Sequence, residues 1–365
     1  MALKRNHWPD GEVVILEHAS SVLEDNPLGD PHVRRFPVWL PPGYSNTSRR
    51  RPYPVLFDLT GYTGSGWAHT NWKNFEENVP ERLARLVHEK RIAPSIVVFP
   101  DCFTALGGNQ YVNSSAIGRY ADYLTRELTA FIDRELRTHG DRDHRGCFGK
   151  SSGGYGALVH GMRFPRYWGA IASHSGDAYF EFCYASIWPE TLTHLACYRK
   201  PARQEGPVKR AADKEGLAEG LDDGRVRRFL DSVWQRERLS GDDVTSLMNV
   251  CMAATYDPDP EAPNGFRLPF HLDTGERIEA RWRVWQRHDP VRLVRRYADN
   301  LRTLRGIYID CGWNDQYHIH YGNRILSREL ERAGVGHTYE EFEGSHSGVD
   351  YRMDRSLPFL SRALR

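Results

Sequence analysis

Short apolar runs alternate with longer amphipathic segments along most of this chain. The runs that predict β-strands lie at residues 12–19, 33–40, 53–59, 95–99, 144–148, 168–173, 306–310 and 338–342. The segments that predict helices lie at about residues 75–90, 117–138, 290–303, 321–333 and 349–364. The first two strands are expected to be antiparallel, and the alternation that follows is typical of parallel strands joined by helices. The pattern therefore predicts an α/β fold, with a mainly parallel central sheet and helices on both faces.

The alternation is interrupted by one long segment, residues 178–288. This segment is rich in charged residues, contains the turn cluster 257–260 and shows no strand–helix–strand order. It also carries many aromatic residues, which a disordered linker would lack. They are Tyr179, Phe180, Phe182, Tyr184, Trp188, Trp234, Trp282 and Trp285. We interpret residues 178–288 as a large cap or lid inserted into a core formed by residues 1–177 and 289–365.

A glycine-rich turn follows the predicted strand 144–148 and precedes a run of small residues. Within it, Gly149, Ser151 and Gly153 form the G-x-S-x-G pattern of a nucleophile elbow. A serine on such a turn has a strained backbone, so its neighbours must lack bulk. The helix that follows points its first N–H groups at the oxygen that becomes negative during attack. Because the chain has 32 glycines, the pattern alone is equally compatible with an ordinary turn.

A nucleophilic serine needs a histidine base, and the histidine needs a carboxylate that orients it. Along the chain of an elbow-type hydrolase, the acid and then the histidine follow the serine, each after a strand. Asp315 follows the predicted strand 306–310, and His346 follows the strand 338–342. Their order and placement predict a catalytic triad of Ser151, Asp315 and His346.

Two other aspartates compete for the role of the acid. Asp310 lies at a strand end and is expected to point away from the site or to support its loop. Asp177 lies in a loop that also opens toward the elbow, and it stays the second choice, either as the acid or as a substrate contact.

Two backbone N–H groups are expected to form an oxyanion hole. One belongs to Ser152, the residue after the nucleophile, and the other to Tyr62, in the loop after the strand 53–59. Gly61 would allow that loop to approach the substrate carbonyl, with a merely flexible turn as the alternative.

Seven stretches of the chain carry a resemblance to one known family. They are residues 38–44 (VWLPPGY), 59–62 (LTGY), 96–101 (IVVFPD), 110–114 (QYVNS), 149–157 (GKSSGGYGA), 310–315 (DCGWND) and 342–346 (FEGSH). The sequence resembles the esterase D and "putative esterase" family of α/β-hydrolases, which includes S-formylglutathione hydrolases, feruloyl esterases, enterochelin esterases and mycolyltransferases. The resemblance implies an α/β-hydrolase fold, with the triad at Ser151, Asp315 and His346.

The sequence departs from the family pattern at two places. Lys150 precedes the nucleophile, where many relatives carry histidine or another residue, and the insertion 178–288 is far longer than in compact members. Because the insertion would shape the substrate pocket, the resemblance does not imply a substrate.

Several residues near the predicted site are candidates for its wall. They are Gly61, Tyr111, Ser114, Asp177, Trp313 and His318. For Tyr111 and Ser114 a structural turn is an equal alternative. His318 and His320 lack a third metal ligand nearby, so a place in the pocket wall is favoured over a metal site. The basic run 49–51 is expected to be a solvated loop.

Composition restricts the partners and the compartment. The 365 residues have a formal net charge of +1, which indicates neither a nucleic-acid nor an anionic-membrane partner. No apolar run approaches the roughly 18 residues of a membrane span, and the first residues do not resemble a secretory signal. The six scattered cysteines are expected to be reduced, so the expected location is cytoplasmic.

The sequence thus predicts a serine carboxylic-ester hydrolase that acts on a small-molecule ester through an acyl-enzyme, without a cofactor or a metal. The alternative is an acyltransferase that passes the acyl group to an alcohol other than water. A non-catalytic binding module is disfavoured, because all three catalytic positions are filled. The family resemblance also implies a homodimer.

Overall fold

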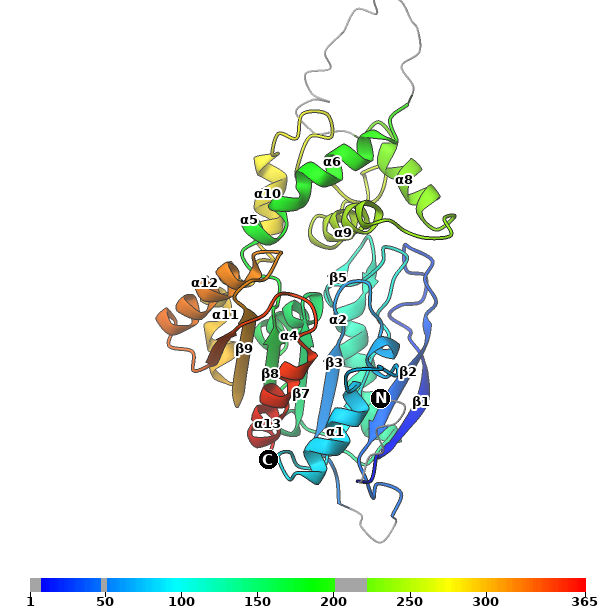
Figure 1. Cartoon of the computed structure of the whole chain (residues 1–365). Helices are drawn as coiled ribbons and strands as arrows, with labels where there is room; N and C mark the ends of the chain where they lie inside the picture. Colours follow the sequence, from blue (N-terminus) through cyan, green and yellow to red (C-terminus); the bar gives the residue numbers. More distant parts are fainter. Residues whose placement is uncertain (1–7, 47–50, 201–221) are drawn as a thin grey trace, which may run out of the picture.

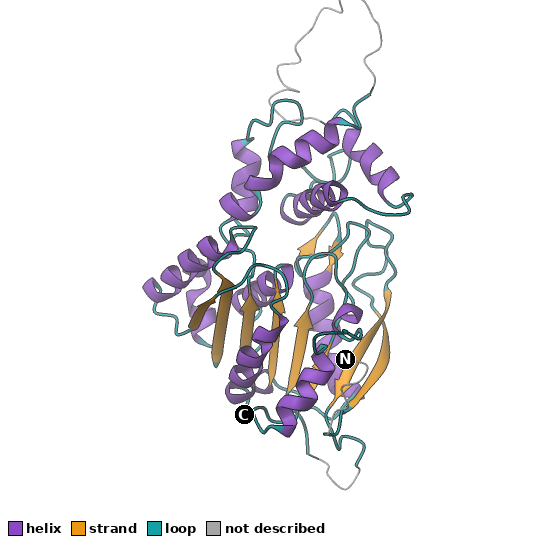
Figure 2. Ribbon diagram, in the orientation of Figure 1, coloured by secondary structure: helices purple, strands orange, loops and turns teal. Residues whose placement is uncertain are grey.

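A mainly parallel sheet forms the centre of the molecule (Figure 1 and Figure 2), in a computed structural model that describes residues 8–46, 51–200 and 222–365. Its strands are β1 Glu12–Ala19, β2 Val33–Leu40, β3 Val55–Leu59, β4 Ile96–Val98, β7 Arg145–Lys150, β8 Ala170–His174, β9 Gly306–Gly312 and β10 Thr338–Phe342. They follow one another across the sheet as β1-β2-β4-β3-β7-β8-β9-β10. Both pairs that involve β2 are antiparallel, and all other neighbours are parallel. The predicted fold class is confirmed.

Helices alternate with these strands and also fill the long segment between β8 and β9. Those of the alternating part are α1 Val79–His88, α2 Tyr120–Asp122, α3 Thr129–Glu135, α4 Ser152–Arg163, α11 Pro290–Arg302, α12 Ile319–Arg332 and α13 Met353–Ala363. Those of the long segment are α5 Phe180–Cys183, α6 Trp188–Ala196, α8 Arg225–Val233, α9 Gly241–Tyr256 and α10 Glu279–Gln286.

Successive side chains of the parallel strands enter hydrophobic cores on opposite faces of the sheet. In β3, Phe57 packs into the core that contains Leu158 of α4, and Leu56 packs into the other core. That second core contains Leu83 of α1 and Leu357 of α13, the two helices that lie on the same face in Figure 1. Burial on both faces explains why β3 reads as a continuous apolar run rather than as an alternating one.

The single helix predicted over residues 117–138 is wrong at both ends. Gly118 has a φ of 145°, which no helix accommodates, and it pairs in a short hairpin between β5 Asn113–Ser114 and β6 Gly118–Arg119. The helical part begins only at α2, passes through a π-helical stretch, η2 Tyr123–Leu128, and ends with α3 at residue 135. The predicted apolar stripe is present, but backbone geometry sets where the helix starts.

The helices of the long segment lie above one end of the sheet in Figure 1, and their aromatic residues pack together. Trp188 contacts both Trp282 and Trp285, and Tyr256 contacts Tyr184. These rings belong to the same hydrophobic cluster as the apolar residues of β3. The described part of this segment is therefore folded onto the rest of the molecule, and its division from the core at residues 178 and 288 stays an interpretation.

The structure can be compared with the predictions about a membrane span, the cysteines and the basic run 49–51. In the described part of the chain, no helix has the length and apolar character needed to cross a bilayer. All six cysteines are unpaired, and five of them are buried, with Cys197 exposed. Of the basic run 49–51, residues 49 and 50 lie outside the described residues, and Arg51 is exposed.

Candidate active site

Ser151 occupies the sharp turn between β7 and α4. Its φ of 57° and ψ of −123° place a residue with a side chain in a sparsely populated backbone region. The turn is held by the Ser151 N–H, which donates to the carbonyl of His174 at 3.0 Å, and by the Ser151 carbonyl, which accepts from the N–H of Tyr155 at 2.8 Å. The strained conformation is typical of a nucleophile elbow.

The two glycines of the elbow are required by a close approach to β3. A Cβ on Gly153 would lie 1.8 Å from the carbonyl oxygen of Leu59, and a Cβ on Gly149 would lie 2.2 Å from the same oxygen. No side chain fits at either position without moving backbone. The G-x-S-x-G pattern is therefore explained by packing of the turn against the neighbouring strand.

His346 and Asp315 form a buried hydrogen-bonded pair. The His346 Nδ1 lies 2.7 Å from Asp315 Oδ2, and the His346 N–H donates to the side-chain carbonyl of Gln316 at 2.9 Å. Burial alone would raise the pKa of Asp315, but His346 and backbone N–H groups, including that of Tyr317 at 2.9 Å, outweigh it and hold the pKa below its usual range. An ionised carboxylate that accepts from Nδ1 leaves the other ring nitrogen of His346 able to act as a base.

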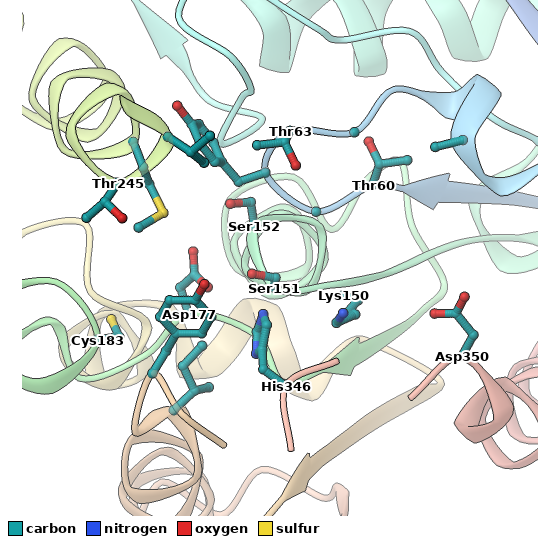
Figure 3. Close-up of a pocket in the computed structure, with 18 of the residues that line it drawn as sticks. Thr60, Thr63, Lys150, Ser151, Ser152, Asp177, Cys183, Thr245, His346 and Asp350 are labelled. Atoms are coloured by element: carbon teal, nitrogen blue, oxygen red, sulfur yellow. The ribbon is translucent and has the colours of Figure 1, made fainter. Parts of the chain in front are cut away.

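Ser151 and His346 line one cavity of about 480 Å³. Figure 3 shows the imidazole of His346 pointing toward Ser151. The cavity wall comes from the loops after β3, β7, β8, β9 and β10, and from α9 and the end of α5 in the long segment. The loops meet there because the carboxyl ends of parallel strands lie at the same edge of a sheet. The structure thus brings together the three residues of the predicted triad.

The loop after β3 lies against the elbow. A Cβ on Gly61 would be 3.5 Å from Cβ of Ser151, so the backbone approaches the nucleophile closely there. The N–H of Gly64 is used in a turn, where it donates to the carbonyl of Gly61, and the N–H of Thr63 donates to the carbonyl of Gly107 in another loop. Tyr62 is tied down through its hydroxyl, which donates to the carbonyl of Leu106 at 2.8 Å.

The two N–H groups predicted to form the oxyanion hole belong to Tyr62 and Ser152, and both residues line the cavity. Neither N–H donates to any group in the described ranges of the chain. Free donors beside a nucleophile are what an oxyanion hole requires.

Asp177 also lines the cavity, but its carboxylate is held by other partners than His346. Its Oδ2 accepts from the Tyr184 hydroxyl at 2.7 Å and from the Gln110 amide at 3.3 Å. Burial raises the pKa of Asp177, and the hydrogen bond from Tyr184 only partly offsets it. Gln110 also donates to the Ser152 hydroxyl at 2.7 Å. These bonds indicate that Asp177 is a residue of the cavity wall, whereas Asp315 is the aspartate that is hydrogen-bonded to His346.

Asp310 is fully buried and does not line the cavity of Ser151. Its carboxylate lies 2.6 Å from Nδ1 of His174 and accepts from Arg352 and Tyr308, each at 2.9 Å. His174 in turn contacts the hydroxyl of Ser356 at 2.8 Å. This network ties β8 and β9 to α13, which agrees with the expected supporting role.

Four of the predicted wall residues do not line the cavity of Ser151. Tyr111 is buried behind the loop after β3, where its hydroxyl donates to the carbonyl of Thr60 at 2.5 Å. Ser114 donates to the carbonyl of Ala254 at 2.5 Å and so fastens the β5–β6 hairpin to α9. Trp313 and His318 line a separate depression, and Trp313 is 50% exposed. Of the six candidates, Gly61 and Asp177 are at the cavity.

The described residues include one cluster whose ligand atoms are close enough for a metal ion: His139, Asp141 and His144, away from the cavity. The rings of His139 and His144 stack at 3.8 Å with 9° between their planes. Lone pairs in parallel planes do not converge on one ion. The rings of His318 and His320, the pair noted in the sequence, lie 6.5 Å apart.

Comparison with known families identifies the chain. A profile of the Esterase family, described as "Putative esterase", matches residues 31–354. The chain belongs to this family. The match includes the long segment 178–288 as well as the loops that carry Ser151, Asp315 and His346.

Curated relatives of this Esterase-family chain match only part of it. Esterases MT1326 and Rv1288 of Mycobacterium tuberculosis are each 30% identical over 147 residues, which is 39% of this chain and 28% of the relative. The chain therefore matches less than a third of the length of the curated relatives.

Solved structures share the fold of this Esterase-family chain over nearly its whole length. A ferulic acid esterase is 19% identical, covers 97% of this chain and 99% of its own, and has a TM-score of 0.58. An S-formylglutathione hydrolase from Agrobacterium tumefaciens is 17% identical, covers 100% and 99%, and has a TM-score of 0.55. FphF, a fluorophosphonate-binding serine hydrolase of Staphylococcus aureus, is 14% identical, covers 96% and 98%, and has a TM-score of 0.56. The fold is that of the α/β-hydrolase esterases.

A set of charged residues on one side of the cavity was not predicted from the sequence: His69, Lys73 and Asp350, with the buried Asp58 bonded to His69. His69 and Lys73 lie in the loop between β3 and α1, and Asp350 follows β10. One signal was available. Asp58 is a carboxylate inside the apolar run of β3, and a buried carboxylate needs a partner. That partner is Nδ1 of His69 at 2.6 Å.

Proposed function

We propose that this protein hydrolyses carboxylic esters of small molecules through an acyl-enzyme on Ser151. The observation that carries the proposal is the geometry of one cavity. A serine on a strained elbow shares it with His346, whose Nδ1 is hydrogen-bonded to the buried carboxylate of Asp315. Membership in the Esterase family supports the same reaction class.

In the proposed reaction, His346 accepts the proton of the Ser151 hydroxyl while the serine oxygen attacks the ester carbonyl. The N–H groups of Tyr62 and Ser152 stabilise the oxyanion of the tetrahedral intermediate. The intermediate collapses, and the alcohol leaves with the proton from His346. A water molecule then gives a proton to His346 and attacks the acyl-enzyme, which releases the acid and restores the Ser151 hydroxyl.

The proposal is tested with a fluorophosphonate probe and a short-chain aryl ester such as 4-nitrophenyl butyrate. The wild-type protein should be labelled once, on Ser151, and should hydrolyse the ester. Ser151→Ala should lose both the label and the turnover, whereas Ser356→Ala should stay labelled, because Ser356 is fully buried. Wild-type turnover by Ser151→Ala would rule out the mechanism.

Crowding the loop beside the nucleophile should slow the proposed reaction. A Cβ on Gly61 would lie 3.3 Å from the carbonyl oxygen of Lys150, so in Gly61→Ala the loop and the N–H of Tyr62 must shift by a few tenths of an ångström. Losing a whole oxyanion donor costs about 10²–10³ in kcat, and for a displaced donor we expect about a tenfold loss.

The matched control is Gly241→Ala, where an added Cβ meets nothing within 4 Å. Both variants are measured by kcat for the aryl ester and by thermal unfolding. Equal kcat values for the two variants would argue against the Tyr62 N–H as an oxyanion donor.

A further inference from the structure

We propose that the cavity wall beside Lys150 binds a carboxylate of the substrate, so that the enzyme prefers esters carrying a second, ionised carboxyl group over neutral esters of the same size. This inference rests on the proposed ester hydrolysis and adds the substrate class. It is carried by the position of one lysine and by the charges around it.

Lys150 immediately precedes the nucleophile, and its side chain lines the same cavity as Ser151. Within the described ranges, its ammonium group makes no hydrogen bond and no ion pair. Burial lowers the pKa of Lys150, against the opposing effect of the carboxylates of Asp350 and Asp315. An anion that binds to a partly desolvated cation without a direct partner gains more binding free energy than it would beside the same cation in water.

The other charged groups on this side of the cavity are already paired. Lys73 is bonded to Asp350 and also lies 3.4 Å from Glu76. His69 is bonded to Asp58 at 2.6 Å. Burial opposes protonation of His69, but the charge of Asp58 outweighs it, so the pKa of His69 lies above its usual value.

Lys150 is therefore the cation on this side of the cavity that has no carboxylate partner within the described residues. Lys73 has Asp350 and Glu76 as partners, and His69 has Asp58. A single ammonium group without a partner matches a monoanion, which favours a carboxylate over a doubly charged phosphate group as the natural occupant.

The cavity offers different surroundings on the two sides of the nucleophile. Figure 3 shows Lys150 and Asp350 on one side of Ser151 and His346, and Asp177, Cys183 and Thr245 on the other. The lining also includes Tyr184, which follows Cys183, and Val244 and Met248, which lie on α9 with Thr245. An ester with its carbonyl at Ser151 would therefore place an apolar group against α9 and a charged group beside Lys150.

The experiment compares kcat/KM for two matched substrate pairs. Mono-4-nitrophenyl glutarate and 4-nitrophenyl valerate differ by a carboxylate on the acyl side, and 4-acetoxybenzoate and its methyl ester differ by one on the alcohol side. The ratio of anionic to neutral substrate in each pair is the readout, because a purely structural change would alter both substrates alike. Wild-type protein should prefer the anionic member of at least one pair.

In that pair, Lys150→Met should lower the ratio by about tenfold or more, the value of one charge-assisted contact. Lys150→Arg should retain most of the preference. Asp350→Asn should raise it, because it removes a carboxylate whose charge acts on Lys150 and leaves Lys73 with Glu76 as its carboxylate partner. The matched control is Lys200→Met, which removes an exposed charge that does not line the cavity.

A wild-type ratio near one in both pairs, or a ratio that Lys150→Met leaves unchanged, would overturn the inference while leaving ester hydrolysis standing. If the protein hydrolyses neither member of either pair and Ser151 is not labelled, the proposed function itself fails. Should Lys150→Met not fold, the opposite shift in Asp350→Asn decides the question.

Discussion

Replacing Asp315 with asparagine should lower kcat for a short-chain aryl ester by about 10⁴-fold. The carboxylate accepts from Nδ1 of His346 at 2.7 Å and is itself fixed by the N–H of Tyr317 at 2.9 Å. An asparagine at this position offers an N–H₂ group to His346 and favours the wrong tautomer, in which the nitrogen facing Ser151 carries a proton and cannot accept another. The defect should therefore lie in kcat, with KM changed much less.

The matched variant is Asp177→Asn, because Asp177 lies in the same cavity and was the second choice for the acid. Its carboxylate is bonded to Tyr184 and Gln110, so its replacement should cost far less than the loss of Asp315. Steady-state kinetics on both variants, with circular dichroism to verify folding, separate the two acids. If kcat falls by about 10⁴-fold in Asp177→Asn and not in Asp315→Asn, the acid of the proposed triad is assigned wrongly.

The proximity of Ser151, Asp315 and His346 could be predicted from the sequence because each of these residues follows a strand of its own. In a parallel sheet the strand ends meet at one edge, so chain order and strand assignment together specify which loops meet. Ser151 follows β7, Asp315 follows β9 and His346 follows β10. Their side chains are brought together by topology, although Asp315 lies 164 positions after Ser151 in the sequence.

The direction in which a side chain near the site points could not be predicted from the sequence. Tyr111 and Ser114 were expected in the cavity wall, but Tyr111 has a φ of 58°, and the two hydroxyl groups bond to the backbone carbonyls of Thr60 and Ala254 without lining the cavity. Neither residue type nor spacing encodes that rotation. The pair of Lys73 and Asp350 joins residues 277 positions apart, and no local pattern connects them.

The surroundings of Asp310 show that residue types and hydrogen bonds alone do not define a catalytic site. A serine, a histidine and an aspartate are bonded in series at Ser356, His174 and Asp310. All three are buried, and none lines the cavity. Two features distinguish the proposed catalytic triad from this structural one. Its serine lies on a strained turn, and a substrate can reach that serine through the cavity.

Replacing Asp310 with asparagine should destabilise the protein by about 3–5 kcal/mol at neutral pH, the usual cost of breaking a buried ion pair. The carboxylate is fully buried between His174 on β8 and Arg352 next to α13. Its removal leaves the Arg352 guanidinium beside α13 without this buried acceptor. The variant should be measured by urea unfolding, with Asp299→Asn, at a 97% exposed side chain, as a control expected within about 0.5 kcal/mol of wild type.

The pH dependence of that difference tests its cause. Burial alone would raise the pKa of Asp310, but His174 and Arg352 outweigh it and hold the pKa below its usual range. A carboxyl whose pKa is lower in the folded state contributes stability above its unfolded pKa, about 4, and loses it as the pH falls through the folded value. The difference in unfolding free energy between wild type and Asp310→Asn should thus be full at pH 7 and shrink below about pH 4. A difference that stays constant down to pH 3 would show that packing, rather than charge, makes Asp310 necessary.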